Sequence, residues 1–202
     1  MITHLVTPAK AGVPLPLRAR SGIPAFAGMT IWGLFLAGCH ATPANDTARV
    51  AHTRAGNVKL TGRVVDEAQV ISPSTEQQLS DRSVALEKST TDQLVVVTLP
   101  SLRGAPIEEV GLALGRGWGV GQRKLDNGVL LIVAPDDHKV RIEVGYGLEG
   151  LLSDDRAGKI VRDMLPLFKA NQIERGIRLG ESEIIEILES DKRRPQYYKK
   201  AA

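Results

Sequence analysis

Two spacings of apolar residues recur along the chain, and together they predict the order of its strands and helices. Residues 94–99 form a continuous, β-branched run, which is typical of a central strand covered on both faces. Residues 129–133 form a second apolar run, and apolar and polar residues then alternate over 140–144. Because residues 135–137 between them are the turn formers Pro, Asp and Asp, these two runs predict an antiparallel β-hairpin.

Apolar residues repeated every three or four positions predict four helices. The first spans 72–90 and starts with a serine N-cap followed by proline at the first helical position. The second covers 106–118, and the third starts at residue 153 and is ended by Pro166, because proline interrupts helical hydrogen bonding. The fourth extends from about residue 172 to 188, and we expect its two interior glycines to allow close packing.

The order of these elements predicts an α/β fold, a small three-layer α/β/α sandwich around a mixed, mostly parallel central sheet that includes the β-hairpin. The strands at 94–99 and 129–133 are expected to be parallel and joined by a right-handed crossover, because a helix lies between them. A short apolar run over 62–66 precedes the first helix. A chain of 202 residues, 43% of them hydrophobic, is long enough for one domain with its own core.

The two ends of the chain differ in composition from its middle. Residues 39–59 are small and polar without apolar periodicity, which predicts a flexible tether, and residues 191–202 form a basic tail that is expected to be disordered. The folded domain is therefore placed at 60–190. This part carries 21 acidic and 15 basic residues, although the whole chain has a formal charge of +3. Because nucleic-acid binding needs a basic face on the domain itself, a nucleic-acid partner is not expected.

Residues 1–38 have the segment order of a secretory signal peptide. Basic residues come first, an apolar stretch over 31–36 follows, and small residues precede the only cysteine, Cys39. The stretch Leu36-Ala37-Gly38-Cys39 resembles the lipobox of bacterial lipoproteins, in which the cysteine becomes the lipidated first residue after cleavage. The alternative is a signal peptide that contains a cysteine without lipidation.

The same region bears on where translation starts and on where in the cell the protein is located. Residues 1–28 are rich in proline, glycine and alanine and fit a signal peptide poorly, so Met29 is an alternative start, although it would remove the basic Arg18 and Arg20. His40 after the cysteine, in place of an aspartate, resembles the sorting pattern for the outer membrane of Gram-negative bacteria. The expected location is the bacterial cell envelope, lipid-anchored in the outer membrane and facing the periplasm.

Motifs for nucleophilic catalysis and for phosphate cradling are missing from the sequence. Its one cysteine lies at the signal, no G-x-S-x-G elbow occurs, and only His138 in the predicted hairpin turn lies beyond residue 60 among the histidines. The glycines of 117–121 follow a predicted helix, whereas a dinucleotide-binding loop follows a strand. We interpret these glycines as a flexible connection.

Oxygen ligands for a metal ion gather at the open end of the predicted hairpin. A hairpin brings its two outer ends together, so Asp126 and Asn127 before the first strand should lie beside Glu149 after the second. Carboxylate and amide oxygens without histidine or cysteine favour Ca²⁺ or Mg²⁺ over Zn²⁺, and a divalent cation relieves the repulsion among carboxylates. The candidate metal ligands are Asp66, Asp126, Asn127, Glu143, Glu149 and Asp154.

Several of these residues also have a purely structural interpretation. The run Asp126-Asn127-Gly128 is an ordinary turn signal, and Asp154 beside a serine N-cap complements the helix dipole. Glu143 alternates with core-facing residues and fits a solvated strand position. The residue pattern alone leaves both interpretations open.

At these positions the sequence resembles the TPM-domain family, which is named for thylakoid-lumen, photosystem-repair and receptor-modulator members and is abundant in bacterial envelopes. The resemblance covers residues 62–188, and its most specific block is the G-Y-G-L-E-G of 145–150. The other matching segments are Val65-Asp66, Ile71-Ser72, 93–98, 118–121, 126–131, 141–144, Pro166 with Phe168, and Gly176-Ile177.

The resemblance implies an α/β/α sandwich, a divalent-cation site that is often a Ca²⁺ site, and the weak acid-phosphatase activity ascribed to some plant members. Carried onto this sequence, it implies the same six candidate ligands. Many bacterial relatives have a transmembrane helix and a glycine-rich tail after the domain, whereas residues 189–202 are polar, so anchoring is expected at Cys39.

The function expected from the sequence is that of a lipid-anchored interaction or maintenance module for membrane proteins, with a protein partner in the envelope. Its cation-bound loops would hold that partner. The alternative is a weak metal-assisted acid phosphatase, with Arg141 or Arg156 as the cationic helper beside the phosphate.

Overall fold

The structure is a computed structural model that describes residues 50–54 and 56–190. The predicted signal peptide, the predicted lipidation site Cys39 and the basic tail 191–202 lie outside the described residues.

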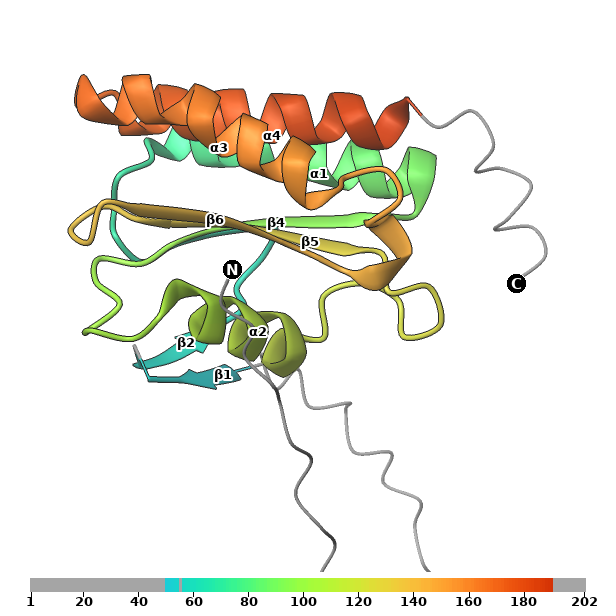
Figure 1. Ribbon diagram of the computed structural model, residues 1–202, viewed down its shortest axis with the longest axis horizontal. Coiled ribbons are helices and arrows are strands. Elements are labelled where there is room, and N and C mark those ends of the chain that lie inside the picture. The colour runs from blue at the N-terminus through green and yellow to red at the C-terminus, as the bar shows by residue number, and fades with distance from the viewer. Residues whose placement is uncertain (1–49, 55, 191–202) are drawn as a thin grey trace, which may run out of the picture. The chain divides into compact units, whose positions relative to one another are not determined.

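A four-stranded sheet forms the centre of the domain (Figure 1). Its strands are β3 (Val64–Asp66), β4 (Gln93–Thr98), β5 (Gly128–Ala134) and β6 (Lys139–Val144), and they lie in the order β3-β4-β5-β6. The pairs β3–β4 and β4–β5 are parallel, and β5–β6 is antiparallel. The mixed, mostly parallel sheet and the β-hairpin are therefore confirmed.

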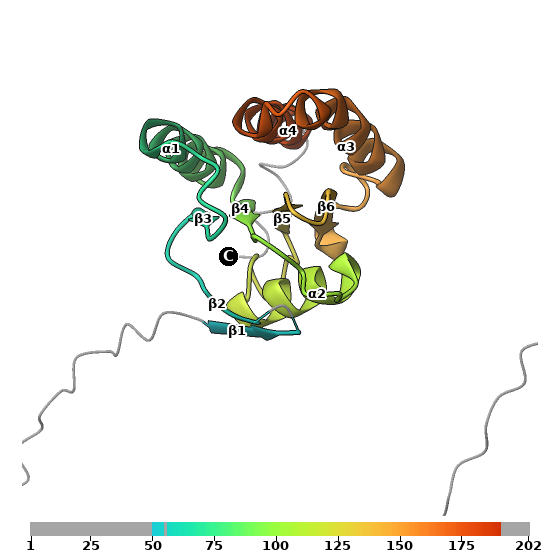
Figure 2. The ribbon, with the colours of Figure 1, turned by 90° about the vertical axis from the view of Figure 1, so that its left-hand side faces the viewer.

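Helices cover both faces of this sheet (Figures 1 and 2). On one face lie α1 (Pro73–Thr90), α3 (Asp154–Lys169) and α4 (Ile173–Glu189), and on the other lies α2 (Ile107–Trp118). The predicted three-layer sandwich is confirmed. None of the helices in the described ranges has the length and apolarity needed to cross a membrane.

The two crossovers between parallel strands have opposite hands. The chain steps in the same direction along the sheet from β3 to β4 and from β4 to β5, but α1 passes over one face and α2 over the other (Figure 2). The right-handed crossover was expected for the β4–β5 connection through α2, and Figure 2 shows this hand, because β4 and β5 run toward the viewer with β5 on the right and α2 below. With this arrangement each face of the buried β4 receives a helix directly.

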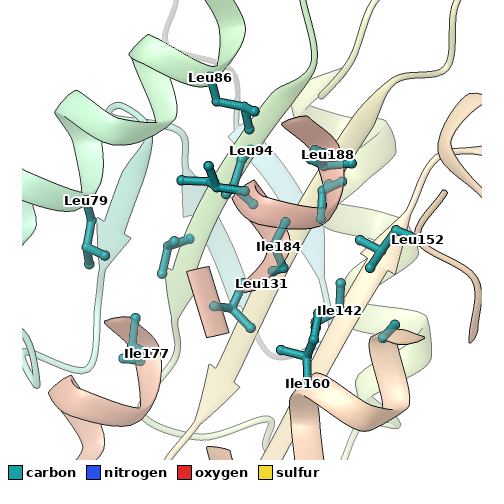
Figure 3. Close-up of a cluster of buried hydrophobic side chains, with 14 of the residues drawn as sticks. Leu79, Leu86, Leu94, Leu131, Ile142, Leu152, Ile160, Ile177, Ile184 and Leu188 are labelled. Carbon is teal, nitrogen blue, oxygen red and sulfur yellow. The ribbon is translucent and has the colours of Figure 1, made fainter. Parts of the chain in front are cut away.

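Alternate residues of the strands point into two separate cores. The larger core lies under α1, α3 and α4 and is aliphatic (Figure 3). Gly176 and Gly180 of α4 face α3, where an added Cβ would lie 2.2 Å from the Phe168 ring and 2.5 Å from the Met164 sulfur. The predicted close packing at these glycines is confirmed. The labelled side chains of Figure 3 are Leu79, Leu86, Leu94, Leu131, Ile142, Leu152, Ile160, Ile177, Ile184 and Leu188.

A small hairpin precedes the domain boundary predicted from the sequence. The strands β1 (Val50–Thr53) and β2 (Gly56–Lys59) pair antiparallel and pack on α2. Ala51 is completely buried, and the Trp118 indole N–H donates to the carbonyl of Val58 at 3.1 Å. The prediction of a flexible tether over 39–59 is therefore wrong for these strands. The segment is polar because only one side of so short a hairpin contacts the core.

The third helix does not end at Pro166 as predicted. It continues to Lys169, and the N–H of Ala170 still bonds to the Pro166 carbonyl at 3.1 Å. Proline removes one hydrogen-bond donor, but the packing of Phe168 against α4 retains the last turn.

Glu174 of α4 holds the start of α1. Its carboxylate accepts hydrogen bonds from the backbone N–H and the hydroxyl of Ser72, at 3.3 and 3.1 Å, and from the hydroxyl of Thr75. The hydrogen bond from Thr75 in particular lowers the pKa of Glu174. Ser72 is the N-cap residue as predicted, but its own side chain makes no capping hydrogen bond. A carboxylate distant in sequence therefore satisfies polar groups at this helix start.

Candidate functional site

The open end of the β5–β6 hairpin brings distant glycines and backbone carbonyls into contact. The N–H of Gly145 donates to the Gly128 carbonyl at 2.8 Å, and that of Gly147 donates to the Asp126 carbonyl at 3.1 Å. A Cβ on Gly147 would lie 1.9 Å from the carbonyl oxygen of Leu125, so only glycine fits there. The predicted meeting of the two strand ends is confirmed.

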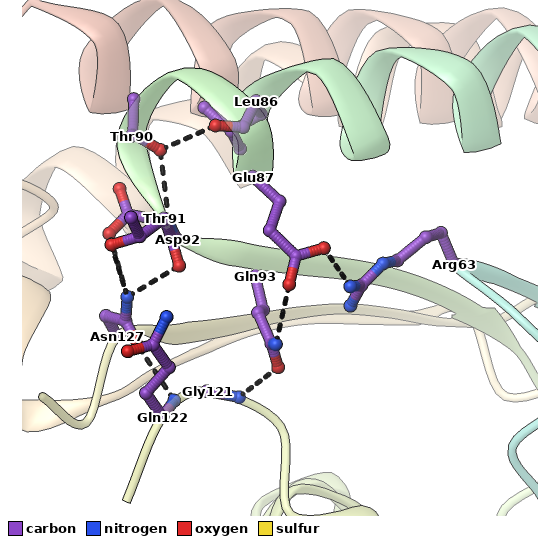
Figure 4. Close-up of polar contacts among 10 residues, drawn as sticks. All are labelled: Arg63, Leu86, Glu87, Thr90, Thr91, Asp92, Gln93, Gly121, Gln122 and Asn127. Atoms are coloured by element: carbon purple, nitrogen blue, oxygen red, sulfur yellow. Dashed lines mark hydrogen bonds and ion pairs between the residues drawn. The ribbon is translucent and has the colours of Figure 1, made fainter. Parts of the chain in front are cut away.

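Asn127 fixes the loop that precedes β5 (Figure 4). Its side chain is completely buried, and its amide group donates to the Thr91 carbonyl at 2.7 Å. Its side-chain oxygen accepts the backbone N–H of Gln122 at 2.8 Å. Because both ends of the amide are used, Asn127 ties the loop before β5 to the turn between α1 and β4.

A second set of polar contacts connects the loop between α2 and β5 to the last turn of α1 (Figure 4). The side-chain oxygen of Gln93 accepts the N–H of Gly121 at 2.8 Å, and its amide group donates to Glu87 at 2.8 Å. The other oxygen of Glu87 pairs with Arg63. This chain of contacts positions the loop after α2 against the first residues of β4 and β5.

An open groove lies between the end of α2 and the open end of the hairpin, and we call it the hairpin groove. Its volume is about 940 Å³. Its charged lining residues are Arg116, Arg123, Asp126, Glu143 and Glu149, and its apolar lining includes Leu112, Val120, Val144 and Tyr146. The short 3-10 helix η1 (Tyr146–Leu148) carries the tyrosine and leads to Glu149.

Of the charged side chains that line the hairpin groove, only Glu143 has an ion-pair partner among the described residues. The Glu143 carboxylate accepts a hydrogen bond from Arg141 Nε at 2.7 Å. Asp126 and Glu149 are exposed, and neither side chain forms an ion pair or a hydrogen bond with another described residue. The same holds for Arg116 and Arg123 within the described ranges. The groove therefore presents both signs of charge to a ligand.

Asp66 lies at the opposite end of the sheet from Asp126. The parallel strands β3, β4 and β5 end together, whereas Asp126 precedes β5 and Glu149 follows the antiparallel β6. The Asp66 carboxylate accepts the N–H groups of Val70 at 3.2 Å and Ile71 at 2.9 Å, and the hydroxyl of Thr98. The prediction that Asp66 belongs to the same ligand set is wrong. Its carboxylate instead closes the turn that leads to α1.

Two more of the predicted metal ligands do not present a side-chain oxygen to the hairpin groove. The Asn127 side chain is buried in the hydrogen bonds described above, so its oxygen does not face a ligand. Asp154 is exposed in the first turn of α3, where it complements the helix dipole, and it does not line the groove. The contacts of Asn127 and the position of Asp154 therefore agree with the structural interpretation of both residues.

The remaining carboxylates do not form a closed metal site. Within the described ranges no group of three or more His, Cys, Asp or Glu side chains could hold a metal ion. Of the six ligands predicted from the sequence, the structure brings the side chains of Asp126, Glu143 and Glu149 to the hairpin groove.

Sequence reasoning missed the cationic and apolar members of the groove. Arg116 and Arg123 line it, whereas Arg141 is paired with Glu143 and Arg156 donates to the Leu151 carbonyl at 2.6 Å. The sequence signal for the two missed arginines was their position on either side of the glycines of 117–121, the segment that crosses the hairpin end.

Comparison with known proteins identifies the fold and family. The family model of the TPM domain, labelled TPM phosphatase, matches residues 64–187, which is more than half of the chain. The solution NMR structure of the N-terminal domain of a protein from P. gingivalis is 39% identical, with a TM-score of 0.60. The alignment covers 63% of this chain and 82% of that domain.

Two other bacterial structures share the fold at lower identity. The N-terminal domain of a protein from Corynebacterium glutamicum is 15% identical with a TM-score of 0.51, over 62% of this chain and 79% of the other. A protein from the psychrophilic Bizionia argentinensis is 21% identical with a TM-score of 0.51, over 58% and 81%. The comparison with curated proteins gives no match. The family-model match and the 39% identical structure together establish that this chain belongs to the TPM-domain family.

Proposed function

We propose that this TPM domain is a lipid-anchored interaction module of the bacterial cell envelope, whose hairpin groove binds a hydrated Ca²⁺ or Mg²⁺ ion and helps to hold or maintain membrane proteins. The observation that carries the proposal is the pair of exposed carboxylates, Asp126 and Glu149, which face one groove and are paired with no other described side chain. Carboxylates that face one groove without an ion-pair partner favour binding of a hard divalent cation.

The hydrogen bonds around the groove support a preformed site. Asn127 and Gln93 hold the loop on one side, and the glycines Gly145 and Gly147 hold the hairpin end on the other. With both walls fixed, the backbone that carries the two carboxylates loses little conformational freedom when they bind a cation, and the remaining cost is that of ordering the two side chains. The small number of protein ligands implies weak binding in which the ion keeps several waters.

The membrane anchor is the part of the proposal that rests on the sequence alone. Acylation of Cys39 with several lipid chains would give stable attachment, since one chain binds membranes only marginally. Mass spectrometry of the protein purified from bacterial membranes should show an acylated Cys39 at its N-terminus. An unmodified N-terminus elsewhere would remove the anchor.

Isothermal titration calorimetry with CaCl₂ and with MgCl₂ tests the cation site. The purified chain should release or absorb heat in a saturable way, and Asp126→Ala or Glu149→Ala should abolish this signal. Arg162→Ala, an exposed substitution on α3 across the sheet, is the control for a charge change away from the groove. Absence of a saturable signal at millimolar cation, in a protein shown to be folded, would refute the site.

A metal-assisted phosphomonoesterase is the second candidate function. The observation in its favour is that Arg116 and Arg123 line the same groove as Asp126 and Glu149, so a phosphate could contact both a guanidinium group and a carboxylate-bound cation. The cation would supply neutralisation of phosphate charge when bound. The arginines would orient the phosphate oxygens, and the groove offers no histidine to move a proton.

Hydrolysis of p-nitrophenyl phosphate distinguishes the enzyme from the binding module. An enzyme should lose its turnover in Asp126→Ala and in Arg116→Ala and keep it in Arg162→Ala. A trace rate that none of these substitutions changes, together with saturable cation binding, would favour the module.

A further inference from the structure

We propose that the hairpin groove, once it holds a divalent cation, binds an acidic peptide segment that carries an aromatic or large aliphatic side chain. This inference rests on the proposed cation site and names the class of partner. Its starting observation is that the exposed large hydrophobic residues of the described ranges, Leu112 at 43% and Tyr146 at 81%, both line this groove.

These two side chains reach the groove from different elements of the fold. Leu112 belongs to α2, and Tyr146 belongs to η1 after the hairpin. The partly buried Val120 and Val144 also line the groove and add to its apolar surface. An exposed tyrosine beside aliphatic residues is typical of the anchoring positions of protein interfaces, because it gives a large contact area with few rotatable bonds.

Charge selects among the possible segments. The charged residues that line the groove are two arginines and three acids, but Arg141 neutralises Glu143, so the four that remain have a formal charge of zero. A bound divalent cation changes it to +2. Arg116 and Arg123 have no ion-pair partner among the described residues, and they then dominate the groove. The cation-loaded groove therefore favours an acidic segment, whereas the net charge of the cation-free groove gives no such preference.

The coupling between cation and peptide is reciprocal. If the cation raises the affinity for an acidic peptide, the peptide must raise the affinity for the cation by the same factor. The groove would act as a cation-dependent clamp for acidic, apolar-anchored segments of an envelope protein. A cation-independent groove would show no such coupling.

Fluorescence anisotropy with two labelled synthetic peptides of equal length tests the inference. Both carry the same central Tyr and Leu, and their flanks are Asp and Glu in one and Lys and Arg in the other. The acidic peptide should bind in CaCl₂ or MgCl₂, and chelation with EDTA should weaken it about tenfold. Tyr146→Ala should weaken it about tenfold, and Arg116→Ala or Arg123→Ala about threefold each, while Arg162→Ala leaves it unchanged.

In calorimetry, the cation is titrated into the protein with and without the acidic peptide. The peptide should raise the affinity for the cation about tenfold, the same factor by which the cation raises the affinity for the peptide. If the cation alone gives no signal, the proposed cation site fails. If the cation binds but the acidic peptide does not, or the basic peptide binds more tightly, only the present inference is overturned.

A second copy of this chain is the alternative occupant of the apolar walls. Analytical ultracentrifugation should show a monomer both in wild type and in Tyr146→Ala. A dimer that dissociates in Tyr146→Ala would assign the groove to self-association and overturn the peptide inference.

Discussion

Glu181 of α4 has a side chain that is completely buried against α1. Arg82 Nη1 lies 3.2 Å from its Oε2, but neither carboxylate oxygen has a hydrogen-bond partner in the described part of the chain. Burial raises the pKa of Glu181 to about 7, although the charges of Arg82 and Arg178 act in the opposite direction. We therefore expect protonation of this one carboxyl to make the stability of the domain depend on pH.

The sign and size of this effect follow from proton linkage. The folded pKa of about 7 lies above the ordinary value of 4.5, so the folded protein binds the proton more tightly than the unfolded chain does. The stabilising contribution of Glu181 is complete below pH 4.5 and is lost as the pH rises through 7. A shift of this size corresponds to about 3 kcal/mol, which is a large part of the total stability of a typical domain, about 5–15 kcal/mol.

Urea unfolding followed by circular dichroism measures this contribution when wild type is compared with Glu181→Gln between pH 4 and pH 8. Glutamine has the same shape and does not titrate. The free energy of unfolding of wild type minus that of Glu181→Gln should therefore fall by about 3 kcal/mol as the pH rises. Glu186→Gln, an exposed substitution on the same helix, is the control and should give a difference that hardly varies with pH.

Two results would contradict this reasoning. A difference that stays flat between pH 4 and pH 8 would mean that Glu181 titrates alike in the folded and unfolded chains. A difference that increases with pH would mean that the ion pair with Arg82 outweighs the cost of burial, so that the folded carboxyl has a lowered pKa.

Two other substitutions test how the ends of the sheet are held. Glu174→Ala removes the carboxylate that accepts hydrogen bonds at the start of α1, so we expect it to lower the free energy of unfolding by about 1 kcal/mol at neutral pH. Because the pKa of Glu174 is lowered, this loss should shrink as the pH falls below 4.5, and an equal loss in Glu186→Ala would show that the cap is not the cause. Gly147→Ala should cost about 2 kcal/mol or more in urea unfolding, because its Cβ would lie 1.9 Å from the Leu125 carbonyl oxygen. Gly150→Ala, where an added Cβ meets nothing within 4 Å, should be nearly neutral, and a similar loss in both variants would refute the steric explanation.

Local patterns were sufficient for the strands of the central sheet, for the presence of its four helices, and for one feature of the site. The apolar run of β5 and the alternating run of β6 identified the hairpin, because burial on one or two faces imposes these spacings on neighbouring residues. From the hairpin alone it followed that the residues before β5 and after β6 meet, as Asp126 and Gly147 do. The expectation held because a short turn leaves two antiparallel strands little choice of pairing.

Local patterns failed where a residue depends on a partner far along the chain. Residues 50–59 carry little apolar periodicity, yet β1 and β2 fold because α2 offers them a surface more than fifty positions away. Pro166 remains inside α3 because α4 packs on the turn that follows it. In both cases long-range packing outweighed a local preference.

The tertiary structure likewise decided which polar residues line the groove and which are used in structural hydrogen bonds. Asp66 and Asp126 look alike in the sequence as acids next to apolar strands, but the parallel arrangement of β3 and β5 places them at opposite ends of the sheet. Asn127 directly follows Asp126, yet it is buried because Thr91, at the end of α1, accepts its amide hydrogen. The spacing of apolar residues records which face of an element is buried, whereas the partners of a polar side chain exist only once distant segments have packed together.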